Sequence, residues 1–179
     1  MDLQDFNGDG LYFDEDLPAG VSALLEAAAS QYAEGTAEQP LRAAEALAPH
    51  SLTVQVGLYR FFYYQHRYED ALAVARRVHE LTGPQLGLPA DWRAITLAHL
   101  PQAAATSMGL LRFHLLALKG AGYLNLRLAR FEEGKAMLRK VSELDTDNRL
   151  GARLLLEVLQ ENSAEVIAFP QVAIVERRS

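Results

Sequence analysis

The stretch from Leu52 to Gly83 reads LTVQVGLYRFFYYQHRYEDALAVARRVHELTG, and it decides the fold class of this 179-residue chain. Apolar residues recur at helical spacing on both sides of the polar break Gln65-His66-Arg67. They are Val54, Leu58, Phe61 and Phe62 before the break, and Ala71, Leu72, Ala75 and Val78 after it. The pattern predicts two amphipathic helices joined by a tight turn. Neither helix can bury its apolar face alone, so the pair needs neighbours.

The same scheme recurs on both sides of this stretch. A step of 34 residues back from Ala71 reaches Ala37, within a second helical pattern over residues 21–51. Downstream, Phe131-x-x-Gly134 echoes Tyr68-x-x-Ala71, and Gly122 stands where two paired helices would approach closely. Ala71 and Gly134 are 63 residues apart, which is less than two repeats of 34 residues and predicts an insert at about residues 86–114.

These residues resemble the tetratricopeptide (TPR) repeat family, in which a small residue such as Ala71 sits at the helix crossing and an aromatic residue such as Tyr68 fills the turn. The resemblance implies an all-α solenoid of three helix pairs, at about residues 18–51, 52–85 and 115–148. A capping helix at 149–160 would close the array. An acidic arm (residues 1–17) and a tail (161–179) flank it. The chain lacks the family's favoured tryptophan in every repeat, and Asn125 occupies a usually aromatic position.

The predicted insert and the tail carry weaker patterns. Pro89 suits the first turn of a short helix, Thr96 suits the cap of another, and Pro101 is expected to end it. The histidines show no ligand spacing, so each is expected in a turn or on a helix surface. The tail from Val166 to Val175 favours an extended segment.

Composition excludes several classes of protein. Six acidic residues and no basic ones fall within the first 16 positions, whereas acidic and basic residues balance at 17 each from Leu17 onward. A neutral body argues against nucleic-acid binding. No apolar run approaches the roughly 18 residues of a membrane span, and the acidic N-terminus does not resemble a secretion signal. We therefore expect a cytoplasmic protein, with no membrane and no nucleic-acid partner.

The acidic arm matches the spacing of a calcium-binding loop. Asp5, Asn7, Asp9 and Asp16 fit the ligand positions of an EF-hand-like loop, and Gly10 permits its sharp turn. The entering helix is missing, so an acidic, turn-rich arm without calcium is the alternative. Calcium-regulated binding is therefore one hypothesis for this segment.

Catalytic chemistry is not evident in the sequence. Cysteine is absent, so neither a thiolate metal site nor a cysteine nucleophile is present. Lys119-Gly120-Ala121-Gly122 has no preceding strand pattern, so it does not predict a phosphate loop. We expect neither an enzyme nor a bound cofactor.

The leading hypothesis is a protein-interaction module. The TPR resemblance implies a concave groove lined by the first helix of each pair. Its groove-facing residues would be Glu26, Ser30, Arg60, Tyr63, Tyr64, Lys119, Tyr123 and Arg127. Three cations with three tyrosines suit an extended acidic or carboxylate-ended peptide. The alternative is that the tyrosines pack between helices and the cations are solvated. We also expect the acidic arm, with Leu11, Tyr12 and Phe13, to fold back onto this groove.

A second resemblance concerns the biological setting. The segment Leu86-Gly-Leu-Pro-Ala-Asp-Trp92, together with Leu118-Lys-Gly-Ala-Gly-Tyr123, is similar to small TPR proteins encoded beside bacterial nitrogen-fixation genes. This resemblance implies an accessory factor for maturation of a metalloenzyme such as nitrogenase. Without cysteine, such a factor would act as a chaperone or scaffold.

Overall fold

The computed structural model describes residues 15–167 of the chain, and the side chains of residues 15–159. Every regular element in this range is helical, which confirms the all-α fold class. The elements are α1 (Val21–Ser30), α2 (Glu38–Leu47), α3 (Leu52–Tyr64), α4 (Tyr68–Gln85), the 3-10 turns η2 (Trp92–Ala94) and η3 (Leu97–His99), α5 (Leu100–Arg127), α6 (Phe131–Leu144) and α7 (Ala152–Ile167). None of the helices in the described range is long and apolar enough to cross a membrane.

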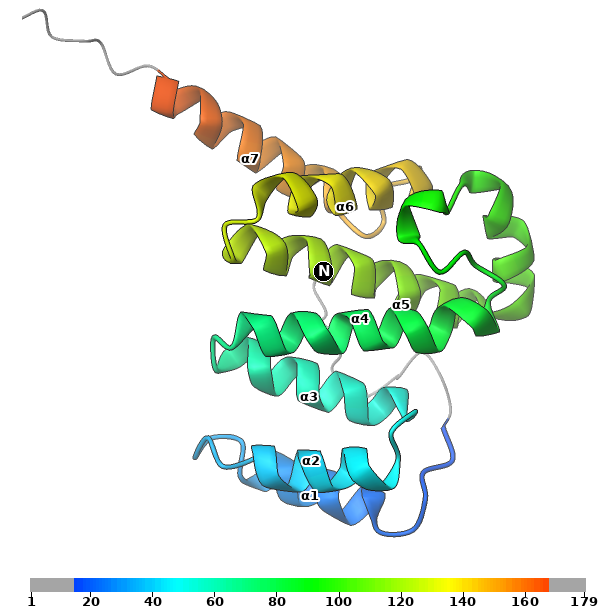
Figure 1. Cartoon of the computed structure of the whole chain (residues 1–179), viewed down its shortest axis with the longest axis vertical. Helices are drawn as coiled ribbons and strands as arrows, with labels where there is room; N and C mark the ends of the chain where they lie inside the picture. The colour runs from blue at the N-terminus through cyan, green and yellow to red at the C-terminus, as the bar shows by residue number, and fades with distance from the viewer. Residues whose placement is uncertain (1–14, 168–179) are drawn as a thin grey trace, which may run out of the picture.

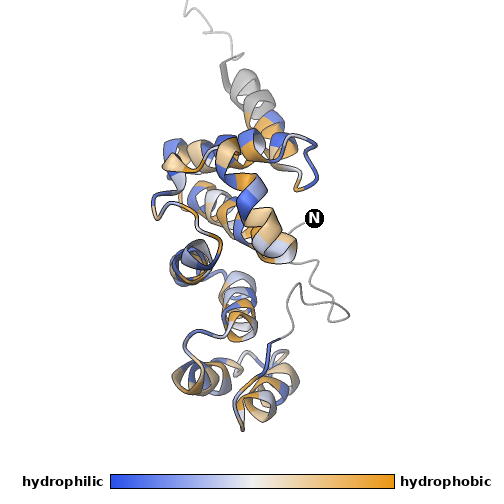
Figure 2. Cartoon of the chain, turned by 90° about the vertical axis from the view of Figure 1, so that its right-hand side faces the viewer, coloured by the Kyte–Doolittle hydropathy of each residue, from blue (hydrophilic) through white to orange (hydrophobic). Residues whose placement is uncertain are grey.

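The α-helices pack mainly against their neighbours in the chain, from α1 on α2 through to α6 on α7 (Figure 1). Seen from the side, α1, α3 and α5 form one layer and α2, α4 and α6 form the other (Figure 2). The core lies between these layers and includes the buried side chains of Leu58, Phe62, Leu72, Leu118 and Leu138. Successive helix pairs thus bury one continuous apolar core, as their sequence periodicity predicts.

The turns inside the three helix pairs share one backbone conformation. Gly35, His66 and Ala129 each adopt a left-handed φ, of 73°, 57° and 58°. In each turn the next amide bonds to the carbonyl five positions earlier. These bonds are Thr36 to Gln31 (3.4 Å), Arg67 to Phe62 (2.9 Å) and Arg130 to Asn125 (2.8 Å). This hydrogen-bond pattern is that of a Schellman turn. His66 and Ala129 lie two residues after the ends of α3 and α5, whereas Gly35 lies five residues after the end of α1, so the turns correspond in their bonding but the first is longer.

The corresponding turns correct the expected step between the first two repeats. Gly35 and His66 are 31 positions apart, whereas His66 and Ala129 are 63 apart. Ala71 therefore corresponds to Pro40 rather than to Ala37, and the first pair is shorter than a 34-residue repeat. The physical reason is the turn between α1 and α2, in which Gly35 adopts a left-handed conformation that glycine adopts without strain.

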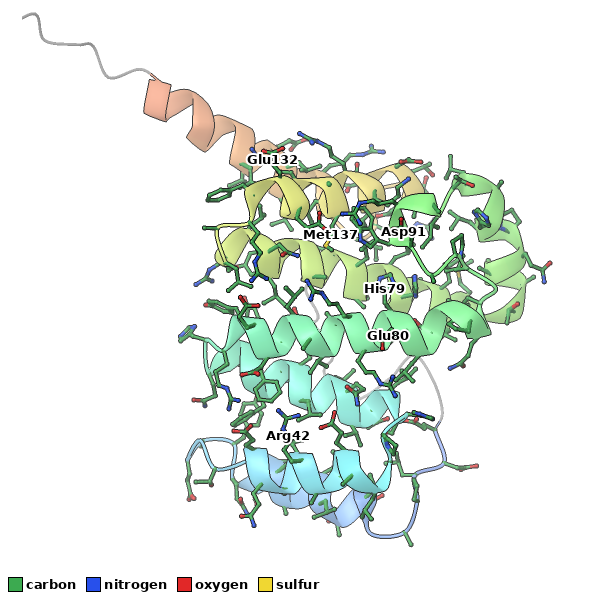
Figure 3. All side chains as sticks on the ribbon, viewed as in Figure 1. Arg42, His79, Glu80, Asp91, Glu132 and Met137 are labelled. Atoms are coloured by element: carbon green, nitrogen blue, oxygen red, sulfur yellow. The ribbon has the colours of Figure 1, made fainter. Side chains whose placement is uncertain are left out.

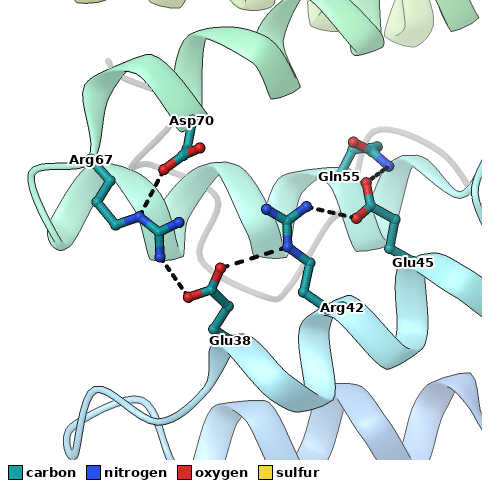
Figure 4. Close-up of polar contacts among 6 residues, drawn as sticks. All are labelled: Glu38, Arg42, Glu45, Gln55, Arg67 and Asp70. Carbon is teal, nitrogen blue, oxygen red and sulfur yellow. Dashed lines mark hydrogen bonds and ion pairs between the residues drawn. The ribbon is translucent and has the colours of Figure 1, made fainter.

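Ion pairs follow the same repeat. Arg67 precedes α4 and pairs with Glu38 at the start of α2, and Arg130 precedes α6 and pairs with Glu69 at the start of α4. Figure 4 shows the first pair within a network that also includes Asp70 and Arg42. These groups are exposed, so each pair contributes little stability, about 0–1 kcal/mol. Each ion pair joins the turn of one helix pair to the start of the second helix of the preceding pair, so the contact between neighbouring pairs repeats.

The helices α5 and α6 approach closely where two glycines face each other. A Cβ on Gly122 would lie 3.1 Å from Leu138 Cγ and 3.2 Å from the carbonyl oxygen of Gly134. A Cβ on Gly134 would lie only 2.8 Å from the carbonyl oxygen of Gly122. The close approach expected at Gly122 is thus present, and it needs a glycine on both helices.

The insert differs from its expected form because Pro101 begins a helix instead of ending one. Pro101 occupies the first turn of α5, where a proline needs no backbone hydrogen bond. Within α5, Ser107 has non-helical angles (φ −164°, ψ 109°), and its hydroxyl accepts a hydrogen bond from the Leu110 amide at 3.1 Å. Ser107 therefore caps the second part of α5 internally, and the third pair begins inside a longer helix.

The C-terminal helix also differs from the expected range. It spans Ala152–Ile167 instead of 149–160, so Val166 and Ile167 are helical rather than extended. The carboxylate of Asp145 accepts hydrogen bonds from the amides of Arg149 (3.1 Å) and Leu150 (2.7 Å), which orders the turn before α7. The remaining tail, residues 168–179, lies outside the described residues.

The end of the acidic arm is anchored at the start of α3. The Glu15 carboxylate accepts hydrogen bonds from the Ser51 hydroxyl (2.8 Å) and from the amides of Leu52 (3.1 Å) and Thr53 (3.0 Å). An acidic side chain is favourable at this positive helix end. Of the expected calcium ligands only Asp16 lies within the described residues, where it is exposed. Asp5, Asn7 and Asp9, and the docking of residues 1–14 onto the groove, lie outside.

Replacing Glu15 with alanine should lower the free energy of unfolding by about 1 kcal/mol, because three donors at the start of α3 lose their acceptor. Chemical denaturation of the two proteins measures this difference. The exposed neighbour Asp16 supplies the control, since Asp16→Ala removes the same charge without removing these hydrogen bonds. Equal denaturation midpoints for the two variants would show that the anchor contributes nothing specific.

Candidate protein-binding face

Five tyrosines and one arginine lie together at one end of the helix pairs, and we call this group the tyrosine face. Its members are Tyr32, Tyr63, Tyr64, Tyr68, Tyr123 and Arg127. The rings form a connected series: Tyr32 to Tyr64 (6.2 Å between centroids), Tyr64 to Tyr63 (5.6 Å) and Tyr63 to both Tyr68 and Tyr123 (6.2 Å each). The series runs from the end of α1 to the end of α5.

The shared turn geometry explains why these side chains meet. Tyr63 and Tyr64 end α3, Tyr123 lies in the last turns of α5, and Tyr32 follows α1. The first helices of the three pairs, α1, α3 and α5, run in the same direction, so their C-terminal ends gather on the left-hand side of Figure 1. Tyr64 is 45% exposed and the other tyrosines are half-buried, so the face is both packed and accessible.

Arg127 places a cation over this aromatic surface. Its guanidinium carbon lies 4.5 Å from the centroid of the Tyr68 ring, and Nη1 donates a hydrogen bond to the Tyr123 hydroxyl at 3.2 Å. That hydrogen bond raises the pKa of Arg127 above its ordinary value. Among the described residues no carboxylate pairs with Arg127. The exposed guanidinium therefore combines cation–π stacking with N–H donors that can reach a carboxylate.

Arg60 lies at the other end of the face, beside Tyr32. Both residues line a cavity of about 280 Å³ between α1, α2 and α3. Burial raises the pKa of Tyr32 to about 12, although the positive charge of Arg60 acts in the opposite direction. Arg60 is half-buried beside the Tyr32 ring and this small cavity. Such a cavity suits the binding of one side chain of a partner.

The structure separates the expected groove residues into three groups. Tyr63, Tyr64, Tyr123 and Arg127 belong to one continuous surface, and Arg60 joins it through Tyr32. Lys119 is only 7% exposed and presents little charge to a partner. Glu26 and Ser30 are exposed on α1.

Sequence reasoning missed two members of this surface, Tyr32 and Tyr68. The signal for Tyr32 was its place at the end of the first helix, which matches the place of Tyr63 at the end of α3. Tyr68 was expected only to fill the turn, but the Arg127 guanidinium also stacks on its ring.

Two histidines contradict the expectation of surface or turn positions. His114 is only 1% exposed, and its ring centroid lies 3.8 Å from that of the half-buried His79. They belong to α5 and α4, and the packing of these helices brings the two rings together. The part of the chain described by the structure contains no group of three or more His, Cys, Asp or Glu side chains placed to hold a metal ion.

The fold and the face define an all-α protein built from consecutive helix pairs with an aromatic, cationic surface. The chain belongs to the same family as the "uncharacterized 19.8 kDa protein in nifW 5'region" of Azotobacter chroococcum mcd 1. The two are 65% identical over 178 residues, which is 99% of each chain. No family model matches the sequence, and no solved structure matches it.

Proposed function

We propose that this chain is a non-catalytic accessory protein that binds another protein through the tyrosine face. The observation that supports this function best is the connected series of tyrosine rings, with the Arg127 guanidinium stacked on it. Tyrosine and arginine are enriched in protein interfaces, and they account for much of the binding energy there.

The helix pairs form, in this proposal, a TPR-like array. Three corresponding turns and the repeated Arg67 and Arg130 ion pairs support it. In such arrays the layer of first helices, here α1, α3 and α5, lines the binding surface. The tyrosine face lies at the C-terminal ends of that layer, so a partner segment that crosses the three helix ends would contact all of it.

The proposed partner is an extended acidic or carboxylate-ended segment. Arg127 has no carboxylate partner among residues 15–159, and Arg60 lies beside a cavity large enough for one side chain. Charge-assisted bonds between a guanidinium and a carboxylate are stronger than neutral hydrogen bonds. The tyrosines would supply contact area, whereas the two arginines would fix the direction of the bound segment.

The related protein is described by its position in the nifW 5′ region, and this suggests a setting in nitrogen fixation. We therefore propose that the partner is a protein involved in maturation of a nitrogen-fixation metalloenzyme. Since the chain has no cysteine, it would hold or present that partner and would not carry a metal cluster on thiolates.

Reversing Arg60 and Arg127 to glutamate should weaken partner binding about a hundredfold, because two charge-assisted contacts become repulsive. Affinity capture from nitrogen-fixing cells, followed by mass spectrometry, compares the double variant with the unmodified protein. Lys119 is not substituted in this variant, because its side chain is buried. Arg139→Glu with Arg149→Glu is the matched control, since both residues are exposed outside the face. Capture of the same proteins by both double variants would refute the proposed surface.

A further inference from the structure

A cavity of about 510 Å³ lies where the insert turns back over α4, α5 and α6. Leu88 and Trp92 of the insert, Leu118 and Met137 of the helices, and His79 of α4 contribute to its lining. Figure 3 labels His79 on α4 and Met137 on α6, with Asp91 of the insert beside them. The volume falls within the range of small-molecule sites, about 300–1,000 Å³. The cavity is separate from the tyrosine face, with which it shares no residue.

The insert closes one side of the cavity through a fixed ion pair. Arg93 Nη2 contacts both carboxylate oxygens of Glu133 on α6, at 2.8 and 2.7 Å. The Arg93 guanidinium also lies 4.3 Å from the centroid of the Trp92 ring. Glu133 is thus already neutralised, and Glu80, the other acid at the cavity, pairs with Arg77 at 3.3 Å.

Arg76 is a charged residue at this cavity that forms no ion pair within residues 15–159. It is exposed on α4 and lines the cavity, and within residues 15–159 no carboxylate forms an ion pair with it. The remaining charges around the cavity, Arg93, Glu133 and Glu80, are already in ion pairs. The mouth of the cavity therefore favours an anion.

His79, which lines the cavity, and its neighbour His114 each have a buried ring nitrogen without a hydrogen-bond partner among the described residues. The Thr82 hydroxyl donates to the Val78 carbonyl (2.7 Å), so its oxygen accepts from His114 Nδ1 (2.7 Å). The Nε2 atom of His114 then has a lone pair. Neither His114 Nε2 nor His79 Nε2 has a hydrogen-bond partner among the described residues. A buried polar atom without a partner is unfavourable, and His79 also lines the cavity with other atoms of its side chain.

We propose that this cavity binds a small organic carboxylate with an apolar body. The carboxylate pairs with Arg76 at the mouth, and the body lies against Trp92, Leu118 and Met137. The site adds a small-molecule ligand to the proposed protein-binding function and does not depend on it.

Trp92 is the single tryptophan of the chain, so its fluorescence reports on this cavity directly. The probe is 4-phenylbutyrate, and the uncharged 4-phenylbutanamide of the same shape is the matched ligand control. We expect a saturable fluorescence change with the carboxylate and about tenfold weaker binding of the amide. No saturable change with 4-phenylbutyrate, or equal affinities for the two compounds, would overturn the proposal.

Substitution of Arg76 tests the same site without disturbing the core. Arg76→Met should weaken binding of 4-phenylbutyrate about tenfold, because the exposed guanidinium is its counter-ion. Arg139→Met, at an exposed arginine of α6 outside the cavity, should leave the affinity unchanged. An Arg76→Met protein that retains full affinity would contradict the assignment of the carboxylate to Arg76.

Discussion

Replacing Gly134 with leucine should lower the free energy of unfolding by about 3 kcal/mol or more. Even a Cβ at this position would lie 2.8 Å from the Gly122 carbonyl oxygen and 2.8 Å from Leu126 Cδ2. One of these contacts is with backbone, so α5 and α6 must move apart to admit any side chain. The separation would expose core residues between the two helices, including Leu138.

Chemical denaturation of the Gly134→Leu protein measures this loss. Glu132→Leu is the matched control, because it adds the same side chain to an exposed position on the same helix. That control should change stability by no more than about 0.5 kcal/mol. Equal stability of the two variants would mean that α5 and α6 do not cross at Gly122 and Gly134.

Mild acid should destabilise the fold through His79 and His114. Burial lowers the pKa of His79 to about 4, and burial together with the neighbouring His79 lowers the pKa of His114 to about 2. Both values lie below the ordinary value of 6.5, so the unfolded chain binds protons first as the pH falls. The stability that depends on the neutral rings is present above pH 6.5 and is lost toward pH 4. At about pH 5 the loss is roughly 2 kcal/mol for each histidine.

Denaturation curves between about pH 7 and about pH 5 measure this dependence, above the range where most carboxylates titrate. The comparison protein carries His79→Phe and His114→Asn, which removes both titrations while Asn keeps a donor for Thr82. Its stability should fall by roughly 4 kcal/mol less over this interval than that of the unmodified protein. Parallel pH profiles for the two proteins would show that the buried rings are not the source of the dependence.

Periodicity along the chain was sufficient to predict the helix pairs. The apolar residues of α3 and α4, and the small residues Ala71, Gly122 and Gly134, are buried or closely packed where their helical spacing predicts. The 34-residue step failed for the first pair because the left-handed residues Gly35 and His66 are 31 positions apart. The position of a left-handed residue in a turn cannot be inferred from the spacing of apolar residues. Pro101 was misread because proline is compatible with both the end and the beginning of a helix.

The side chains that meet across helices were harder to predict. His79 and His114 are 35 residues apart on different helices, so no short spacing marks them as neighbours. The TPR resemblance placed Lys119 on the groove surface, but the packing of α5 buries its side chain to 7% exposure. The four expected residues that do meet, Tyr63, Tyr64, Tyr123 and Arg127, lie at the ends of α3 and α5. The shared turn geometry fixes where those ends lie.

The central claim is that the tyrosine face binds a protein, and site-specific photocrosslinking tests it most directly. A photoreactive p-benzoylphenylalanine replaces Tyr64, which is 45% exposed at the centre of the face, in nitrogen-fixing cells. The control carries it at Leu154, which is 61% exposed on α7 and is not a member of the tyrosine face. We predict one discrete crosslinked protein at position 64 that is missing at position 154 and is lost when Arg60 and Arg127 are reversed. No crosslink at position 64, or the same crosslinks at both positions, would contradict the account.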